Sequence, residues 1–282
     1  MVRLSRQHAG RIVRLRPLVI LVCSIWSLWC TEALAVRPFV TDDARIVYKG
    51  QLGTETYGGT TVVKGASPAY EMRTLEALGI TDRLELTAGG FGFTYQDHQV
   101  RPLDLLIQPK YVLHSSLGAI PSLSVAAAMM YPLSGNRQHW DGYAMMHVSW
   151  FLFTPNADID PYDNDLAIHL NFGTKNRYDA GPATFQSKFY WAAGFEVITF
   201  TREVRFLGEV FNGDPFGFEE KFPAFQTGLR WYKAANTQLD LVFRGVRNTT
   251  EDVRLAAGGG SLSEEWNYTI QVGFRYLIDL FR

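Results

Sequence analysis

The sequence predicts an all-β fold: a closed, antiparallel transmembrane β-barrel of about twelve strands, with short periplasmic turns and longer extracellular loops. Three observations lead to this fold class. Apolar and polar residues alternate with a period of two in short segments, and turn residues separate these segments. No apolar run after residue 35 approaches the roughly 20 residues that a membrane-spanning helix needs. Aromatic residues make up 14% of the chain and bracket the alternating segments, as expected where strands cross both membrane interfaces.

The first 35 residues have the features of a cleaved export signal. Five arginines precede the apolar stretch Pro17–Cys30, which is too short to span a bilayer. Ala33 and Ala35 supply the small residues that a signal peptidase requires, so we expect cleavage after Ala35. An uncleaved anchor helix is the alternative. The predicted organisation is a signal peptide at 1–35 and one outer-membrane barrel at 36–282.

The composition of the mature part suits an exported protein. Both cysteines, Cys23 and Cys30, lie in the signal, and a mature chain without thiols fits an oxidising periplasm. The whole chain has 27 Lys+Arg and 28 Asp+Glu; the signal holds five arginines and one acid, which leaves a net charge of −5 after cleavage. A mildly acidic exported protein has no electrostatic reason to bind nucleic acid.

The clearest predicted strand is 103–114, and it sets the pattern for the others. Its odd positions from Leu103 to Leu113 are apolar and expected to face lipid, whereas Gln108 and Lys110 are expected to face inward. The same alternation recurs in 166–173, 225–232, 239–244 and 268–276. Less regular segments complete the set: 46–58, 68–77, 84–95, 122–132, 142–153, 186–199 and 203–211. A change of phase at Gly89-Gly90 predicts a β-bulge there.

The connections separate the two ends of the barrel. Three tight, polar connections are predicted to be periplasmic turns: 79–82, 200–203 and 233–236. Four longer ones, with Gly, Pro and charge, are predicted to face outward: 133–141, 176–185, 212–222 and 247–266. The connection 154–164 departs from this scheme because it is long and acidic where a short turn is due. Its aspartates could hold a calcium ion, but a solvated acidic turn is the favoured alternative.

Several short motifs resemble one family of outer-membrane proteins, grouped under the meta-pathway of phenol degradation. The motifs are VRPFVTDDA at 36–44, LGITDRLEL at 78–86, PLSG at 132–135 and AIHLNFG at 167–173. The resemblance covers nearly the whole mature chain. It implies a barrel of about twelve strands that passes aromatic or other hydrophobic compounds, and it brings no catalytic residues with it. PLSG departs from the Pro-Thr-Gly that is usual in the family.

The polar faces of the predicted strands supply the candidate functional residues. Those expected to line the lumen are Asp104, Lys110, His169, Asn171, Lys188, Glu196, Glu209, Arg230, Asp240, Arg244 and Arg275. The three arginines fall on the last three strands and are expected to form one wall, with Glu196, Glu209 and Asp240 beside them. Such residues either line a channel or cross-link the lumen through salt bridges. A barrel of about twelve strands lies between filled eight-stranded barrels and open sixteen-stranded porins, so a narrow or partly blocked lumen is predicted.

The leading hypothesis is a passive channel for small molecules, among them hydrophobic or aromatic ones. A lumen-plugged barrel with a structural or surface-interaction role is the main alternative. A lipid-modifying enzyme is a third, because His147 and Ser149 share a strand face, but the bulky Trp150-Phe151-Leu152 follows them. We therefore predict no enzyme, no cofactor and no metal site, since the histidines show no ligand spacing. The predicted partners are outer-membrane lipid, a small-molecule solute and the outer-membrane assembly machinery.

Overall fold

The computed structural model describes residues 39–63, 67–116, 118–133, 139–153, 165–179, 183–216, 221–234, 236–247 and 266–280. The predicted signal and the acidic connection 154–164 lie outside the described residues. Within these ranges, no helix is both long enough and apolar enough to cross a membrane.

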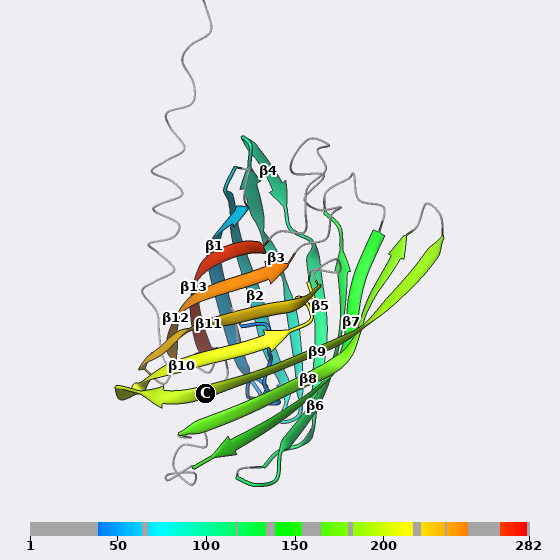
Figure 1. Ribbon diagram of the computed structural model, residues 1–282. Helices are drawn as coiled ribbons and strands as arrows, with labels where there is room; N and C mark the ends of the chain where they lie inside the picture. Colours follow the sequence, from blue (N-terminus) through cyan, green and yellow to red (C-terminus); the bar gives the residue numbers. More distant parts are fainter. Residues whose placement is uncertain are drawn as a thin grey trace, which may run out of the picture.

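Thirteen antiparallel strands form in the described ranges, and twelve of them close a barrel (Figure 1). The strands are β1 (Gln51–Val63), β2 (Ala69–Thr81), β3 (Leu84–Gln96), β4 (Gln99–Pro102), β5 (Leu105–His114), β6 (Ser122–Tyr131), β7 (His139–Leu152), β8 (Leu166–Asp179), β9 (Thr184–Thr199), β10 (Thr201–Phe211), β11 (Lys221–Ala234), β12 (Thr237–Arg247) and β13 (Trp266–Asp279). β13 pairs with β1, and β3 pairs with both β2 and β5, so the sheet has no open edge around the wall. This confirms the predicted closed barrel of twelve strands. The short β4 lies outside the wall and extends a hairpin with β3.

Alternation along each strand produces an apolar outside and a polar inside. On β5, Ile107, Tyr111 and Leu113 are 42–48% exposed, whereas Lys110 is 2% exposed. The same contrast runs through β8 and β10 to β13, whose outward residues are mostly Leu, Ile, Val and aromatic. Since the ladder closes on itself and the outside of the wall is apolar, the chain is an outer-membrane β-barrel. Leu103 is an exception: the sequence placed it on the lipid face, but it precedes β5 and is buried.

The predicted bulge in β3 is present at Gly90. The register of β3 against β2 shifts between Thr74 and Leu75, and Gly90 has a φ of 86°. A Cβ at this glycine would meet the backbone carbonyl of Asp104. Beyond the bulge β3 leaves β5 and continues outward to pair with β4. The bulge therefore separates the part of β3 that builds the wall from the part that projects above it.

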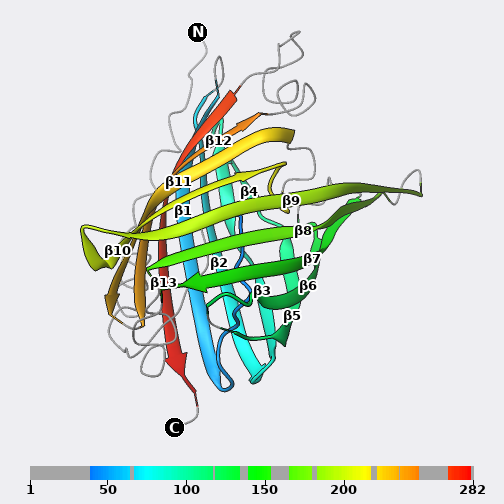
Figure 2. The same ribbon diagram turned by 60° about the horizontal axis from the view of Figure 1, so that its bottom comes forward.

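The two ends of the barrel differ in the length of most of their connections, as predicted. The connection predicted at 176–185 is an exception, because β8 extends to Asp179 and β9 starts at Thr184, which leaves only residues 180–183 between them. The β2–β3, β9–β10 and β11–β12 turns are short and lie at one end, where β1 begins and β13 finishes with Gln51 opposite Asp279. We assign this end to the periplasm. The sequence prediction of a strand at 46–58 is wrong at its start, because β1 begins only at Gln51. The residues before it turn into the barrel interior (Figure 2).

Candidate functional site in the barrel lumen

Residues 39–50, here called the N-terminal segment, lie inside the barrel rather than in its wall (Figures 1 and 2). Its residues 39–44 and Val47 are buried. The segment leads into β1 at the periplasmic end, where Lys49 forms a β-bridge with Gly79 of β2. The segment is therefore part of the lumen, and the residues that hold it define the candidate site.

Two buried glutamates of the wall bind the backbone of the N-terminal segment. Glu209 of β10 accepts the N–H groups of Val40 and Thr41, one on each carboxylate oxygen, at 2.8 and 2.7 Å. Glu85 of β3 accepts the N–H of Val47 at 2.7 Å. Hydrogen bonds to an ionised acceptor are stronger than neutral ones. Because these carboxylates bind backbone N–H groups, the attachment does not depend on the side chains of Val40, Thr41 and Val47.

Side chains of the segment add further contacts around Asp42 and Asp43. Lys110 Nζ donates to Asp42 at 2.8 Å, and the N–H of Ala44 donates to Ser149 Oγ at 2.9 Å. Arg45 pairs with Asp43, and its guanidinium lies 4.5 Å from the ring centre of Phe151. Burial alone would raise the pKa of Asp43, but Arg45 and Lys110 outweigh it and hold that pKa well below its usual range. The Asp43 carboxylate is thus held in its ionised form.

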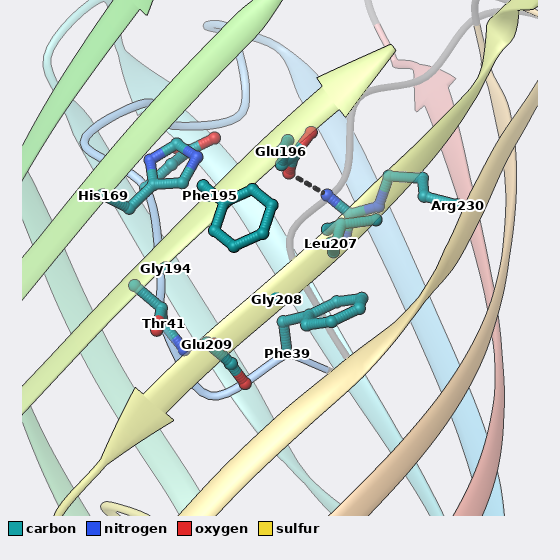
Figure 3. Close-up of a pocket in the computed structure, with 11 residues that line it drawn as sticks. Phe39, Thr41, His169, Gly194, Phe195, Glu196, Leu207, Gly208, Glu209 and Arg230 are labelled. Carbon is teal, nitrogen blue, oxygen red and sulfur yellow. Dashed lines mark hydrogen bonds and ion pairs between the residues drawn. The ribbon is translucent and has the colours of Figure 1, made fainter. Parts of the chain in front are cut away.

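Apolar contacts also hold the N-terminal segment against the barrel wall. Phe39 packs with Leu207 and Val242, and Val47 packs with Ala77 and Leu277. A small cavity of about 10 Å³ remains beside Phe39, room for about one water molecule. Figure 3 shows this cavity between the segment and strands β8 to β11, with Thr41 and Phe39 facing Glu209 and Leu207.

A compact ion network lies next to the segment. Arg230 is 1% exposed and donates to Asp240 Oδ1 at 2.9 Å. It also donates to Glu196 Oε1 at 2.6 Å (Figure 3). Arg205 lies 3.7 Å from the other oxygen of Glu196. Gln238 donates to Asp240 at 2.5 Å. Two arginines and two acids balance one another, which is what burial of charge requires.

The other two arginines have acid partners of their own. Arg275 lies 3.4 Å from Glu55 of β1, and Arg244 donates to Asp214, in the β10–β11 connection, at 2.6 Å. All three arginines face inward on adjacent strands, as the sequence predicted. They do not act as one charged wall, however, because each is paired with different carboxylates. Glu209 is also not beside them as a free acid, since it binds the segment.

The structure places ten of the eleven candidate residues on inward-facing strand positions. Lys110, Glu196, Glu209, Arg230, Asp240, Arg244 and Arg275 make the contacts above; His169, Asn171 and Lys188 face inward on β8 and β9. Asp104 lies between β4 and β5, outside the strands. That these residues line a path for solute stays a prediction.

The lipid-modifying enzyme was considered because His147 and Ser149 share a strand face, but Ser149 is hydrogen-bonded to a different histidine. Ser149 Oγ is bound to His169 Nδ1 at 2.9 Å, across β7 and β8, and it also accepts the N–H of Ala44. Within the described residues, His147 makes no hydrogen bond to Ser149. The predicted His147–Ser149 pair is therefore not formed, and Ser149, with 0% exposure, anchors the N-terminal segment.

Toward the extracellular end, a cluster of apolar side chains lies in the interior beside buried polar ones such as Lys175, Gln226 and Arg244. We call this the apolar layer; its inward-facing members are Tyr57, Leu75, Leu106, Met130, Tyr143, Met145, Tyr190, Ala192, Phe211, Ala224 and Val246. Val40 of the N-terminal segment and Phe216 of the β10–β11 connection pack against them. Tyr143 satisfies its hydroxyl by donating to Gln108. These side chains offer solutes an apolar surface inside the lumen, in addition to the polar residues that the sequence predicted there.

Sequence reasoning missed the residues that hold the segment: Asp42, Asp43 and Glu85. The first two were noticed only as part of a family motif. A signal was present, because residues 39–50 are too polar and too irregular for a lipid-facing strand. Among the described residues, no group of three or more His, Cys, Asp or Glu side chains is arranged to hold a metal ion.

Comparison with known proteins supports the architecture. No protein-family model matches the chain, and no curated protein does. An outer membrane channel from Pseudomonas putida F1 superposes with a TM-score of 0.51 at 13% identity, over 87% of this chain and 100% of that one. The NanC porin and the KdgM porin each give a TM-score of 0.47, at 11% and 10% identity, over 79% of this chain and 98% of theirs. The first likeness supports the barrel fold alone.

Proposed function

We propose that this barrel is a passive outer-membrane channel for small hydrophobic or aromatic molecules, and that its path opens when the N-terminal segment moves. The observation that carries the proposal is the apolar layer. A hydrated channel for ions or sugars gains nothing from inward-facing Leu, Met and Phe side chains, whereas an apolar solute leaves water favourably when it contacts them.

A specific observation also favours the plugged barrel as a second candidate. Backbone groups of the N-terminal segment bind Glu209, Glu85 and Ser149, and its Asp42 binds Lys110. A segment held at four points on different strands would suit a barrel whose interior is permanently filled. The two candidates differ in whether solutes pass.

Uptake of the fluorescent hydrophobic probe N-phenyl-1-naphthylamine by bacteria that express the barrel would test the proposal. We expect uptake to rise several-fold over cells without it, and to fall toward background with Leu106→Asn, which places an amide in the apolar layer. Leu106→Met is the matched control, since it keeps the layer apolar. If expression of the folded wild-type barrel leaves uptake unchanged, the channel proposal fails and the plugged barrel is favoured.

A further inference from the structure

One row of inward-facing polar side chains makes no hydrogen bond to the N-terminal segment within the described residues. Ser124, His147 and Asn171 are direct cross-strand partners on β6, β7 and β8. Their exposures are 0%, 2% and 1%. We call these three residues the polar row. It lies one inward position nearer the extracellular end than the pair Ser149 and His169, of which Ser149 accepts the N–H of Ala44 in the segment.

The polar row concentrates buried polar atoms that lack partners. Within the described residues, Ser124 Oγ, both ring nitrogens of His147, and the amide nitrogen and oxygen of Asn171 have no partner at hydrogen-bond geometry. The Asn171 amide is the cross-strand neighbour of the His147 ring, and a hydrogen bond between the two would satisfy one atom of each. Buried polar groups in native proteins are satisfied by protein, water or ligand, because an unsatisfied one has lost its hydration without replacement. Even with an Asn171–His147 hydrogen bond, three atoms of the row are left for a bound group to satisfy.

On its extracellular side the polar row borders small and apolar residues. Beside His147 it borders an ion pair with no net charge. Directly above it, on the same three strands, are Ala126, Met145 and Gly173. Beside it, Asp42 lies 4.0 Å from His147 Nε2, and Lys110 is bound to that same Asp42 oxygen. The row itself carries no formal charge while His147 is neutral. A ligand here would place a polar head at the row and an apolar body among the residues of the apolar layer.

We propose that the polar row binds the hydroxyl head of a neutral amphiphile, an alcohol or a phenol. This rests on the proposed function and names the class of solute within it. The row offers both donors and acceptors, which a hydroxyl matches because it does both. A carboxylate only accepts and an alkylammonium only donates, so each leaves part of the row unmatched and adds a buried charge. Access requires Met145 to move, and an unbranched Met between Ala126 and Gly173 rearranges easily.

Nitrogen NMR of the ¹⁵N-histidine-labelled barrel in lipid nanodiscs would test this site directly. Titration with 1-hexanol is expected to shift the ring signals of His147, assigned with His147→Gln, and to saturate. Hexanoate and hexylammonium are expected to leave them unchanged. Asn171→Leu and Ser124→Ala should each raise the half-saturating hexanol concentration about tenfold, the loss expected for one hydrogen bond. Asn267→Leu, another inward asparagine with an unpartnered amide oxygen, should not.

Three results would overturn the inference. A shift that grows without saturating, or that both row variants leave intact while they keep heat-modifiable migration, would mean partitioning into lipid. Tighter binding of hexanoate or hexylammonium would mean a site for charged solutes. Ring signals that report bound water and ignore all three compounds would mean an ordered water only. A barrel that binds hexanol at the row but gives no uptake of N-phenyl-1-naphthylamine would instead overturn the proposed function alone.

Discussion

The two layers of the lumen are built on opposite principles. The layer around the N-terminal segment uses single, directed contacts: one carboxylate for two N–H groups, one lysine for one aspartate, one serine for one N–H. The apolar layer above it uses many undirected contacts among Leu, Met, Tyr and Phe side chains. Directed contacts specify one occupant, whereas undirected ones admit any apolar molecule of suitable size. The layer around the N-terminal segment therefore suits one fixed part of this chain. The apolar layer suits solutes that come and go.

The largest effect is expected where a directed contact involves a buried charge. Arg230→Met should destabilise the barrel by about 3–5 kcal/mol, because it leaves Glu196 and Asp240 buried without their main partner. Arg244→Met is the matched control on β12: its partner Asp214 is in a connection, so the loss should be clearly smaller. Urea unfolding in lipid vesicles measures both. Equal losses would contradict the distinction between the buried network and the peripheral pair.

A lipid-facing charge should cost somewhat less than breaking that network. Leu170→Arg puts a guanidinium on the outside of β8, where it should cost about 2–4 kcal/mol near the midplane. Leu170→Phe keeps the surface apolar and should fold as the wild type does. Heat-modifiable migration and urea unfolding report the difference. A Leu170→Arg barrel as stable as the wild type would show that this face does not contact lipid.

The neighbouring residue illustrates what the sequence could and could not provide. Alternation correctly assigns Leu170 outward and Asn171 inward, because side chains alternate along any strand. From the sequence alone, Asn171→Arg is predicted to be nearly silent for folding, because residue 171 points into the lumen. The structure revises this, since Asn171 is 1% exposed beside His147.

The strands, the closure of the barrel, the bulge and the direction in which side chains face follow from local periodicity. The packing inside depends on contacts such as Glu209–Val40, which are 169 residues apart and leave no local pattern.

An intermediate effect is expected from loosening the segment. Glu209→Gln should weaken its attachment by about 1–3 kcal/mol, since an amide cannot accept two N–H groups on two oxygens. Single-channel conductance and the fraction of time open should rise. Glu203→Gln, at an exposed position of the same strand, should change neither. A Glu209→Gln channel that conducts as the wild type does would argue against this attachment as a restraint.

The smallest effect is expected from a volume-conserving change in the apolar layer. Met130→Leu should cost less than about 1.5 kcal/mol and leave uptake of N-phenyl-1-naphthylamine nearly unchanged, because undirected contacts tolerate such swaps. Unfolding and uptake assays on the same preparation would check it. A large loss of uptake would mean that this layer recognises its solute by shape, like the layer below.

The central claim, that the N-terminal segment must move for solutes to pass, can be tested with one reversible cross-link. A Cβ at Gly194 would lie 3.3 Å from Cβ of Thr41, close to the spacing of a disulfide. With the signal removed, Thr41→Cys together with Gly194→Cys supplies the mature chain's two cysteines. In planar bilayers the oxidised protein should lose most of its conductance and recover it on addition of a reductant. Equal conductance in the oxidised and reduced states, with the cross-link verified by mass spectrometry, would contradict the claim.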